Sequence, residues 1–293
     1  MTAIWNIEGP HGSLELATVG PDDGRPVIIH HGTPGAAHPS YPPLDEVAIQ
    51  RGWRQICYSR PGYGGSVRHV GRTVADCAAD VRAIADALGI DRFHTIGGSG
   101  GGPHVLATAA LLGDRVIAAA SIAGIAPWAA ERLDWLAGMG PENVDEFRAA
   151  LAGEAPLREY LDPVRTGMLQ ATADDVYELL DGLLCDIDRA TLTGPYAEQA
   201  VLAMKTALAS GVDGWVDDDL AFSWPWGFEL ASIEVPVTVW QGARDQFVPA
   251  AHGDWLIEHV PNAQPKRLPE HGHLSIAVGL YGEILDELLS AGG

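Results

Sequence analysis

Along most of the chain, short apolar runs alternate with segments in which apolar residues recur at helical spacing. The runs have the length and composition of strands that lie inside a parallel sheet. Two weaker strand candidates, 4–7 and 13–18, precede them and are separated by a Gly-Pro-His-Gly turn. The runs that we interpret as strands of the parallel sheet are 26–31, 54–58, 91–96, 116–123, 235–240 and 264–268.

The predicted helices fall between these strands. The clearest covers 73–88, where apolar residues follow the helical repeat and Gly89 marks the end. Further helices are expected over 44–51, 102–112, 250–260 and 275–289. Alternation of strands and helices indicates a parallel sheet wrapped by helices. The predicted fold class is therefore α/β, with a mostly parallel eight-stranded sheet flanked by helices.

The alternation stops between residue 125 and about residue 225, where the periodicity is helical and no strand is convincing. Active sites of such sheets lie beyond the carboxyl ends of the strands. An all-helical segment inserted after the sixth strand is expected to form a lid there. We predict a core of residues 1–124 and 227–293 and a helical lid of residues 125–226. The lid helices are expected near 142–152, 156–170, 173–184 and 195–210.

Composition narrows the function. The formal net charge is −21, and such a surface repels nucleic-acid phosphates and anionic lipid headgroups. No apolar stretch reaches the ~20 residues of a membrane span, and the amino terminus does not resemble a signal peptide. Cys57, Cys77 and Cys185 are widely spaced and odd in number, as expected of free thiols in a reducing compartment. We expect a cytoplasmic protein, monomeric or homodimeric, that binds neither nucleic acid nor membrane.

The most informative motif is Gly97-Gly98-Ser99-Gly100-Gly101, which fits G-x-S-x-G. It follows a predicted strand and opens a predicted helix. A sharp turn between strand and helix strains its central residue and needs small neighbours. The hydroxyl of Ser99 then stands at the carboxyl end of its strand, close to the positive end of a helix. Ser99 is the candidate nucleophile.

Two other segments are expected to meet Ser99 at the same edge of the sheet. Asp245 follows the strand 235–240, and His273 follows the strand 264–268. Histidine suits the role of base because its pKa lies near neutral pH, and a carboxylate fixes its tautomer. The order Ser, Asp, His along the chain matches that of α/β-hydrolases. His271 is the main rival of His273 as the base.

An oxyanion formed during attack on a carbonyl needs N–H donors. We expect these donors to be the backbone N–H of Gly100 and that of Thr33, in the loop that follows the strand 26–31. Pro34 has no N–H to donate.

These segments resemble the α/β-hydrolase superfamily, in its lidded branch of small esterases, proline iminopeptidase-like enzymes and carbon–carbon bond hydrolases. The resemblance covers the predicted core and is poor over 125–225. The chain departs from the family pattern at Ser59, where the family usually has Asp, which leaves the packing of that loop open. The matching segments are His31-Gly32-Thr33-Pro34-Gly35, Arg60-Pro61-Gly62-Tyr63-Gly64-Gly65-Ser66, the Ser99 turn, 242–249 and Gly272-His273.

The sequence thus predicts a serine hydrolase without cofactor or metal that cleaves a small-molecule ester or lactone. An aminopeptidase and a carbon–carbon bond hydrolase remain alternatives, as does a ligand-binding module that has lost turnover. An aminopeptidase needs lid acids to bind an ammonium group. The acids considered for that role are Glu131, Glu154, Glu159, Asp174 and Asp175.

The remaining expectations concern the pocket and its surroundings. Aromatic residues near the two lid junctions and after the Asp245 strand are candidates for lining the substrate pocket. We interpret His30, His31 and His104 as structural, and Asp217-Asp218-Asp219 as a solvated turn. The pocket candidates are Trp128, Trp224, Trp226 and Phe247.

Overall fold

The computed structural model describes residues 3–37 and 42–291 of the chain. Its eight strands form one sheet in the order β1-β2-β4-β3-β5-β6-β7-β8. The pairs β1–β2 and β2–β4 are antiparallel, whereas the other neighbours run parallel. This arrangement confirms the predicted α/β fold. The strands are β1 (Ala3–Gly9), β2 (Gly12–Val19), β3 (Arg25–His30), β4 (Trp53–Tyr58), β5 (Phe93–Gly98), β6 (Val116–Ile122), β7 (Val237–Gly242) and β8 (Gln264–Leu268).

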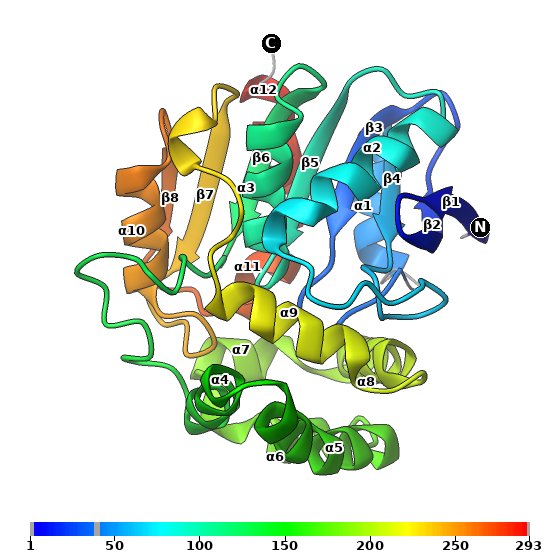
Figure 1. Ribbon diagram of the computed structural model, residues 1–293. Coiled ribbons are helices and arrows are strands. Elements are labelled where there is room, and N and C mark those ends of the chain that lie inside the picture. Colours follow the sequence, from blue (N-terminus) through cyan, green and yellow to red (C-terminus); the bar gives the residue numbers. More distant parts are fainter. Residues whose placement is uncertain (1–2, 38–41, 292–293) are drawn as a thin grey trace.

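Helices cover both faces of the sheet, and Figure 1 shows α2, α3 and α10 in front of it and α1 and α12 behind it. The apolar faces of these helices and of the strands form the core. Within the described residues, no helix has the length and apolar character that crossing a membrane requires. The flanking helices are α1 (Pro42–Gln50), α2 (Cys77–Ala87), α3 (Gly101–Leu111), α10 (Ala250–His259), α11 (Leu274–Gly279) and α12 (Tyr281–Ala291).

The single helix predicted over 275–289 is wrong in one respect, because the structure has two helices there. Leu280, with φ −113° and ψ 11°, leaves the helical conformation between α11 and α12. Gly279 precedes this break, and glycine is a poor helix former. α12 buries Ile284, Leu285 and Leu288 against the sheet.

Between β6 and β7, where the structure describes every residue, the chain forms helices joined by turns and no strand, and we call residues 141–223 the helical insertion. In Figure 1 the insertion packs across the carboxyl ends of the parallel strands, the edge where ligand sites of such sheets lie. Its helices are α4 (Pro141–Ala152), α5 (Glu154–Gln170), α6 (Val176–Leu179), α7 (Asp186–Thr191), α8 (Gly194–Leu208) and α9 (Asp213–Ser223).

The last of these helices, α9, was not predicted. The interpretation of Asp217-Asp218-Asp219 as a solvated turn is wrong, because these residues lie within α9 and are 3%, 0% and 1% exposed. Every residue from 214 to 223 is buried, so α9 has no exposed polar face, and the amphipathic periodicity of a surface helix does not reveal it. The partners of Asp217 and Asp218 are arginines from distant segments of the core.

Candidate active site

Ser99 sits on the turn between β5 and α3 with a φ of 54°, in the left-handed region that non-glycine residues rarely adopt. The glycines of the motif are required by close backbone approach. A Cβ on Gly101 would lie 2.2 Å from the carbonyl oxygen of His30, and one on Gly97 would lie 2.7 Å from that of Gly101. The turn therefore has the strained strand-to-helix geometry that the motif predicts.

Asp245 and His273 come together from the loops that follow β7 and β8. The Nδ1 of His273 lies 2.8 Å from Oδ2 of Asp245. The other carboxylate oxygen, Oδ1, accepts hydrogen bonds from the backbone N–H groups of Phe247 (2.9 Å) and Val248 (2.8 Å). The turn thus fixes the carboxylate, and the partner of the carboxylate is His273 rather than His271.

The pKa of His273 reflects two opposing effects. Burial lowers it, but the charge of Asp245 and its hydrogen bond, with a further contribution from the charge of Asp188, raise it above the usual 6.5. Because the carboxylate accepts, Nδ1 must donate, which leaves Nε2 free as the proton acceptor. The ring of Phe247 stacks on that of His273, with centroids 4.6 Å apart.

The loop after β3 reaches the Ser99 turn. A Cβ on Gly100 would lie 2.3 Å from the hydroxyl oxygen of Thr33, and one on Gly32 would lie 3.6 Å from Cβ of Ser99. The N–H groups of Thr33 and Gly100 have no acceptor within the described part of the chain. The structure thus brings together Ser99, Gly100 and Thr33. It records no hydrogen bond between Ser99 and His273 among the described residues, a bond that often tightens only with substrate.

The loop that carries Thr33 is held by a buried ion cluster centred on Asp218 of α9. Its carboxylate accepts hydrogen bonds from Arg60 (2.6 Å), Arg72 (2.8 Å), Thr33 Oγ1 (2.7 Å) and Tyr63 (3.0 Å). Burial raises the pKa of Asp218, but the two guanidinium groups outweigh it and hold the pKa well below its usual range. Sequence reasoning missed this cluster because its members are far apart in the chain.

Arg60 extends the cluster into the backbone of the loop. Its guanidinium donates to the carbonyl oxygens of His31 (2.6 Å) and Gly32 (3.0 Å) and to the hydroxyl of Thr33 (3.0 Å). These bonds fix the backbone of the loop whose Thr33 side chain lies against Gly100. α9 therefore takes part in shaping the loop beside Ser99.

The loop around Ser59, where the chain departs from the family pattern, is fully packed. The hydroxyl of Ser59 donates to Oε1 of Glu15 at 2.8 Å and accepts from the N–H of Ala37 at 2.8 Å. Gly64 and Gly65 lie against the same carboxylate. Glu15 of β2 thus supplies an acid to this loop from another strand.

A second carboxylate of the helical insertion holds the His273 segment. Asp188 of α7 is fully buried and accepts hydrogen bonds from three consecutive backbone N–H groups, those of His273 (2.7 Å), Leu274 (3.0 Å) and Ser275 (2.9 Å). These are the first N–H groups of α11, which have no partner within the helix. Asp188 therefore positions the backbone of His273.

The three histidines interpreted as structural are buried or half-buried and hydrogen-bonded. His30 contacts Tyr58 and Thr108 at 3.1 Å each, and burial lowers its pKa to about 3. Nε2 of His31 accepts from the N–H of Arg60 at 3.1 Å. Nδ1 of His104 bonds the carbonyl oxygen of Gly100 at 2.8 Å. His31 and His104 thus bond backbone groups of the loops around Ser99, and His30 bonds side chains of the core beneath them.

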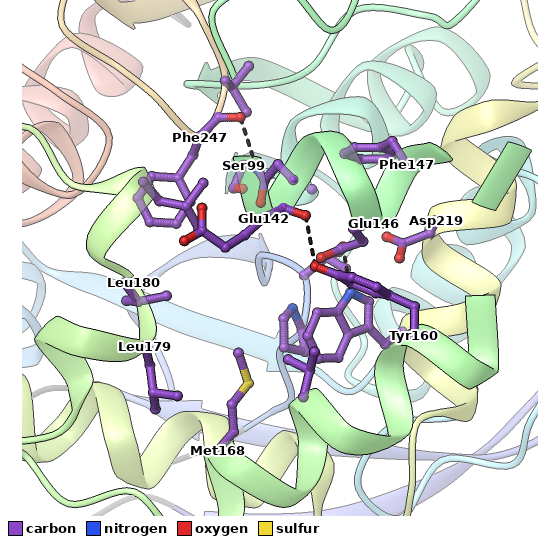
Figure 2. Close-up of a pocket in the computed structure, with 18 of the residues that line it drawn as sticks. Ser99, Glu142, Glu146, Phe147, Tyr160, Met168, Leu179, Leu180, Asp219 and Phe247 are labelled. Atoms are coloured by element: carbon purple, nitrogen blue, oxygen red, sulfur yellow. Dashed lines mark hydrogen bonds between the residues drawn. The ribbon is translucent and has the colours of Figure 1, made fainter. Parts of the chain in front are cut away.

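A cavity of about 380 Å³ lies between the Ser99 turn and the helical insertion. Thr33, Ser99, Gly100 and Phe247 line it, and most of its remaining wall is aromatic or aliphatic. Figure 2 shows Ser99 and Phe247 at one side, with Leu179, Leu180 and Met168 of the insertion at another. The size and apolar lining fit a small organic molecule.

The prediction that Trp128, Trp224 and Trp226 line the pocket is wrong. Trp128 packs on Trp135 at a centroid distance of 5.2 Å, and Trp226 stacks on Phe228 at 5.9 Å. Trp224 is 48% exposed. Of the four predicted aromatic residues, only Phe247 lines the cavity.

The acids that line the cavity also differ from those considered for an ammonium site. Glu131, Glu154, Glu159, Asp174 and Asp175 are absent from its wall. The carboxyl groups that do line it belong to Glu142, Glu146, Glu178 and Asp219. The sequence predicted helices at α4 and α6 but not which of their faces points into the cavity. It did not predict α9.

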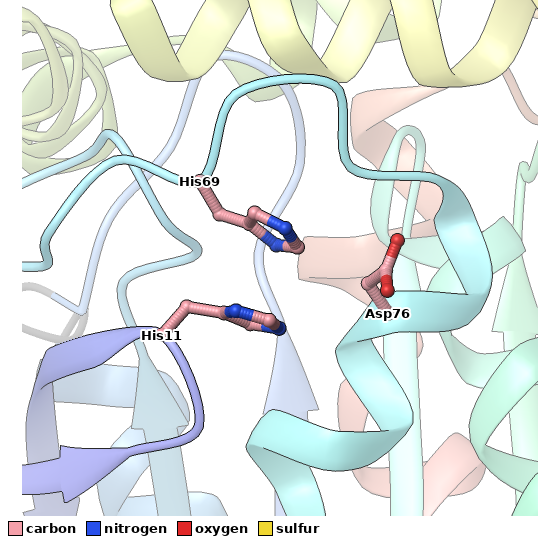
Figure 3. Close-up of side chains that lie close together, drawn as sticks. All are labelled: His11, His69 and Asp76. Carbon is pink, nitrogen blue, oxygen red and sulfur yellow. The ribbon is translucent and has the colours of Figure 1, made fainter.

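Away from the cavity, one group of three possible metal ligands occurs in the described part of the chain: His11, His69 and Asp76 (Figure 3). Their ligand atoms lie within 4.8 Å of one another. The two imidazole rings are stacked, with centroids 3.6 Å apart and planes at 20°, so their lone pairs run side by side and do not converge. Asp76 already accepts two hydrogen bonds from Thr73. We assign no metal to this group.

Comparison with known proteins places this site in a family. A family model described as alpha/beta hydrolase fold matches residues 25–280. The chain belongs to the α/β-hydrolase family. It is 32% identical over 234 residues to a non-heme chloroperoxidase of Streptomyces lividans, covering 79% of this chain and 78% of that protein. It is 28% identical over 254 residues to a non-heme haloperoxidase of Rhodococcus erythropolis, covering 85% and 86%.

Among solved structures, a thermophilic esterase of Thermogutta terrifontis matches with a TM-score of 0.70 at 19% identity, covering 99% of this chain and 100% of that one. At this identity the likeness concerns the fold alone. The family assignment supports a hydrolase. The kind of bond it cleaves has to be inferred from the geometry of this chain's own site.

We predict that Asp218→Asn strongly destabilises this α/β-hydrolase. The change leaves the buried guanidinium groups of Arg60 and Arg72 without their counter-charge, a defect that costs about 3–5 kcal/mol. Urea denaturation measures it. The matched control is Asp145→Asn on the exposed face of α4, expected to stay within about 0.5 kcal/mol of wild type. Equal stability of the two variants would contradict the role of the cluster.

We predict that Asp188→Asn lowers the pKa of His273, because the charge of Asp188 helps to raise it. The amide oxygen keeps an acceptor for the backbone N–H groups. Titration of the His273 ring by NMR measures the shift, and circular dichroism checks the fold. Asp186→Asn, an exposed position of the same helix, is the control. An unchanged His273 pKa in folded Asp188→Asn would show that this charge does not act on the ring.

Proposed function

We propose that this hydrolase cleaves a small-molecule ester or lactone through an acyl-enzyme formed on Ser99. The observation that carries the proposal is the strained turn that presents Ser99 to the cavity, in one site with an Asp245–His273 pair at 2.8 Å. Phe247 links the two parts, because it lines the cavity and stacks on His273. A serine hydroxyl needs such a base to attack a carbonyl.

In the proposed reaction, Nε2 of His273 takes the proton of Ser99 as the hydroxyl oxygen attacks the substrate carbonyl. Asp245 holds Nδ1–H and stabilises the imidazolium that forms. His273 then gives the proton to the leaving alcohol, and the ester bond to that alcohol breaks. A water molecule, deprotonated by His273, attacks the acyl-enzyme and releases the acid and Ser99.

The N–H groups of Thr33 and Gly100 are proposed to hold the oxyanion of each tetrahedral intermediate. Among the described residues neither N–H has an acceptor, which leaves both available to an oxyanion. Each donor of this kind is worth about 10²–10³ in rate. The contact between the two residues also supports this role.

We further propose that the helical insertion acts as the lid of the site. It supplies most of the apolar wall of the cavity, which favours a small organic substrate over a polymer. A lid over the nucleophile also excludes bulk water, which strengthens the electrostatic interactions inside.

We expect Ser99→Ala to remove most turnover, a loss of about 10⁶-fold. The assay is release of p-nitrophenol from acyl esters of increasing chain length, and the optimum length sizes the acyl side of the cavity. Ser290→Ala, an exposed serine of α12, is the control and should keep full activity. Ester turnover that survives in Ser99→Ala would refute the mechanism. A folded wild type without ester turnover would refute the substrate class and leave peptide or carbon–carbon bonds, or ligand binding alone.

We expect kcat/KM to rise with pH through the pKa of His273, because only the neutral ring accepts a proton. Since that pKa is raised, the midpoint should lie above 6.5. Asp245→Asn removes the charge that raises it, so the midpoint should fall, and the rate should drop by about 10⁴-fold through loss of the correct tautomer. A wild-type midpoint below 6.5 would contradict this assignment.

A further inference from the structure

Two carboxyl groups lie next to each other on the wall of the cavity, Glu146 of α4 and Asp219 of α9 (Figure 2). Asp219 is 1% exposed, yet both of its oxygens lack a hydrogen-bond donor among the described residues. Glu146 receives one hydrogen bond, from Nε1 of Trp215 at 2.9 Å. Buried polar atoms are nearly always paired, so the unpartnered oxygens of Asp219 require an explanation.

Among the described residues, no Lys, Arg or His donates a hydrogen bond to either carboxyl group. The residues that line the cavity include no Lys, Arg or His within the described part of the chain. Arg72 is the cation that acts on Asp219, but its guanidinium donates to Asp218 and to the carbonyl oxygen of Gly214. The other charged groups of the wall, Glu142 and Glu178, carry the same sign, and Oε2 of Glu142 is also buried without a donor.

The pair therefore holds protons that ordinary carboxyl groups release. Burial raises the pKa of Glu146 to about 7. Burial and the nearby charge of Glu146 raise the pKa of Asp219 well above its usual value. A proton shared between the two groups offsets their repulsion. A cation placed against them would replace that proton and satisfy the free oxygens.

We propose that Glu146 and Asp219 form a subsite for a protonated amine carried by the acyl part of the substrate. A metal ion fits less well, because the described residues place no third His, Cys, Asp or Glu close enough to complete a three-ligand group with the pair. An ammonium group offers several N–H donors, which the unpartnered oxygens can accept as charge-assisted bonds. The aromatic rings of Trp215 and Tyr160 on the same wall suit the hydrocarbon part of an amine.

This proposal rests on the proposed function, because Ser99 and the acid pair share one cavity. It narrows the substrate class from any small ester to esters or lactones of amino acids with a free basic nitrogen. A neutral acyl group would leave Asp219 without a donor, so the cavity should discriminate against it.

The test uses a pair of ligands that differ at one atom. The p-nitroanilide of piperidine-4-carboxylic acid has a basic nitrogen where that of cyclohexanecarboxylic acid has a carbon. Calorimetry measures binding of each to the Ser99→Ala variant, so that the readout does not depend on turnover. We expect the piperidine ligand to bind about tenfold tighter or more, the effect of a charge-assisted hydrogen bond. Equal affinity, or tighter binding of the cyclohexane ligand, would overturn the proposal.

Variants identify the groups responsible. Glu146→Gln with Asp219→Asn, introduced together into Ser99→Ala, should abolish the preference for the piperidine ligand. Asp145→Asn in the same background changes the charge of α4 equally on its exposed face and should keep the preference. Circular dichroism verifies that the variants fold. If the double variant does not fold, the two single substitutions are tested separately. A preference that persists without both carboxyl groups would overturn the assignment.

The dependence on pH gives a second readout. Because ligand binding displaces a proton from the pair, affinity for the piperidine ligand should increase as pH rises from 6 to 8, where a secondary amine stays protonated. Calorimetry in buffers of different ionisation enthalpy should detect the released proton. Affinity that does not change with pH would contradict proton displacement and overturn the assignment to this pair.

The outcomes separate this proposal from the proposed function. Turnover of neutral p-nitrophenyl esters without any preference for the amine would leave the esterase function intact and refute the subsite. A preference for the amine without any ester turnover would support the subsite and refute the esterase function.

Discussion

The site depends most on the buried contact of Asp218 with Arg60 and Arg72. None of these three side chains is more than 3% exposed, so each charge is compensated only by the others. Separating α9 from the core would leave the guanidinium groups of Arg60 and Arg72 buried without their counter-charge, a defect that costs about 3–5 kcal/mol. The cluster therefore fixes the helical insertion to the loop of Thr33, and through Arg60 it fixes the loop backbone as well.

Asp188 likewise connects the insertion to the segment that carries His273. Its three hydrogen bonds to the start of α11 tie α7 to the segment that carries His273. The insertion thus positions two backbone segments of the site in addition to covering the cavity. These ties support the base and the N–H donor that we propose on the two loops, since groups with catalytic roles need rigid neighbours to hold their geometry. The insertion therefore cannot move away as one body without breaking the ion pairs of Asp218 and the hydrogen bonds of Asp188.

The sequence predicts the parts of the site that follow from strand order and local turns. The Ser99 turn, Asp245 and His273 each come directly after a strand, and parallel strands end at one edge. The cavity wall was not predictable in this way, because α4 and α9 orient their side chains through packing with each other and with α5. α9 itself is buried on all sides and lacks an amphipathic pattern, and its aspartates suggested a solvated turn. The signal that existed was the set of arginines at 60, 68 and 72, which require acidic partners once they are buried.

The three aspartates of α9 show how a single helix turn serves three environments. Successive residues point about 100° apart around a helix. Asp217 meets Arg68 at 2.7 Å near the surface, and Asp218 meets the core arginines. Asp219 turns to the cavity and meets another acid. Two neighbouring carboxyl groups therefore have opposite shifts of pKa, lowered for Asp218 and raised for Asp219. Arg60 and Arg72 donate hydrogen bonds to Asp218 and not to Asp219. The carboxyl group of Asp219 therefore remains available to pair with a cation carried by a ligand.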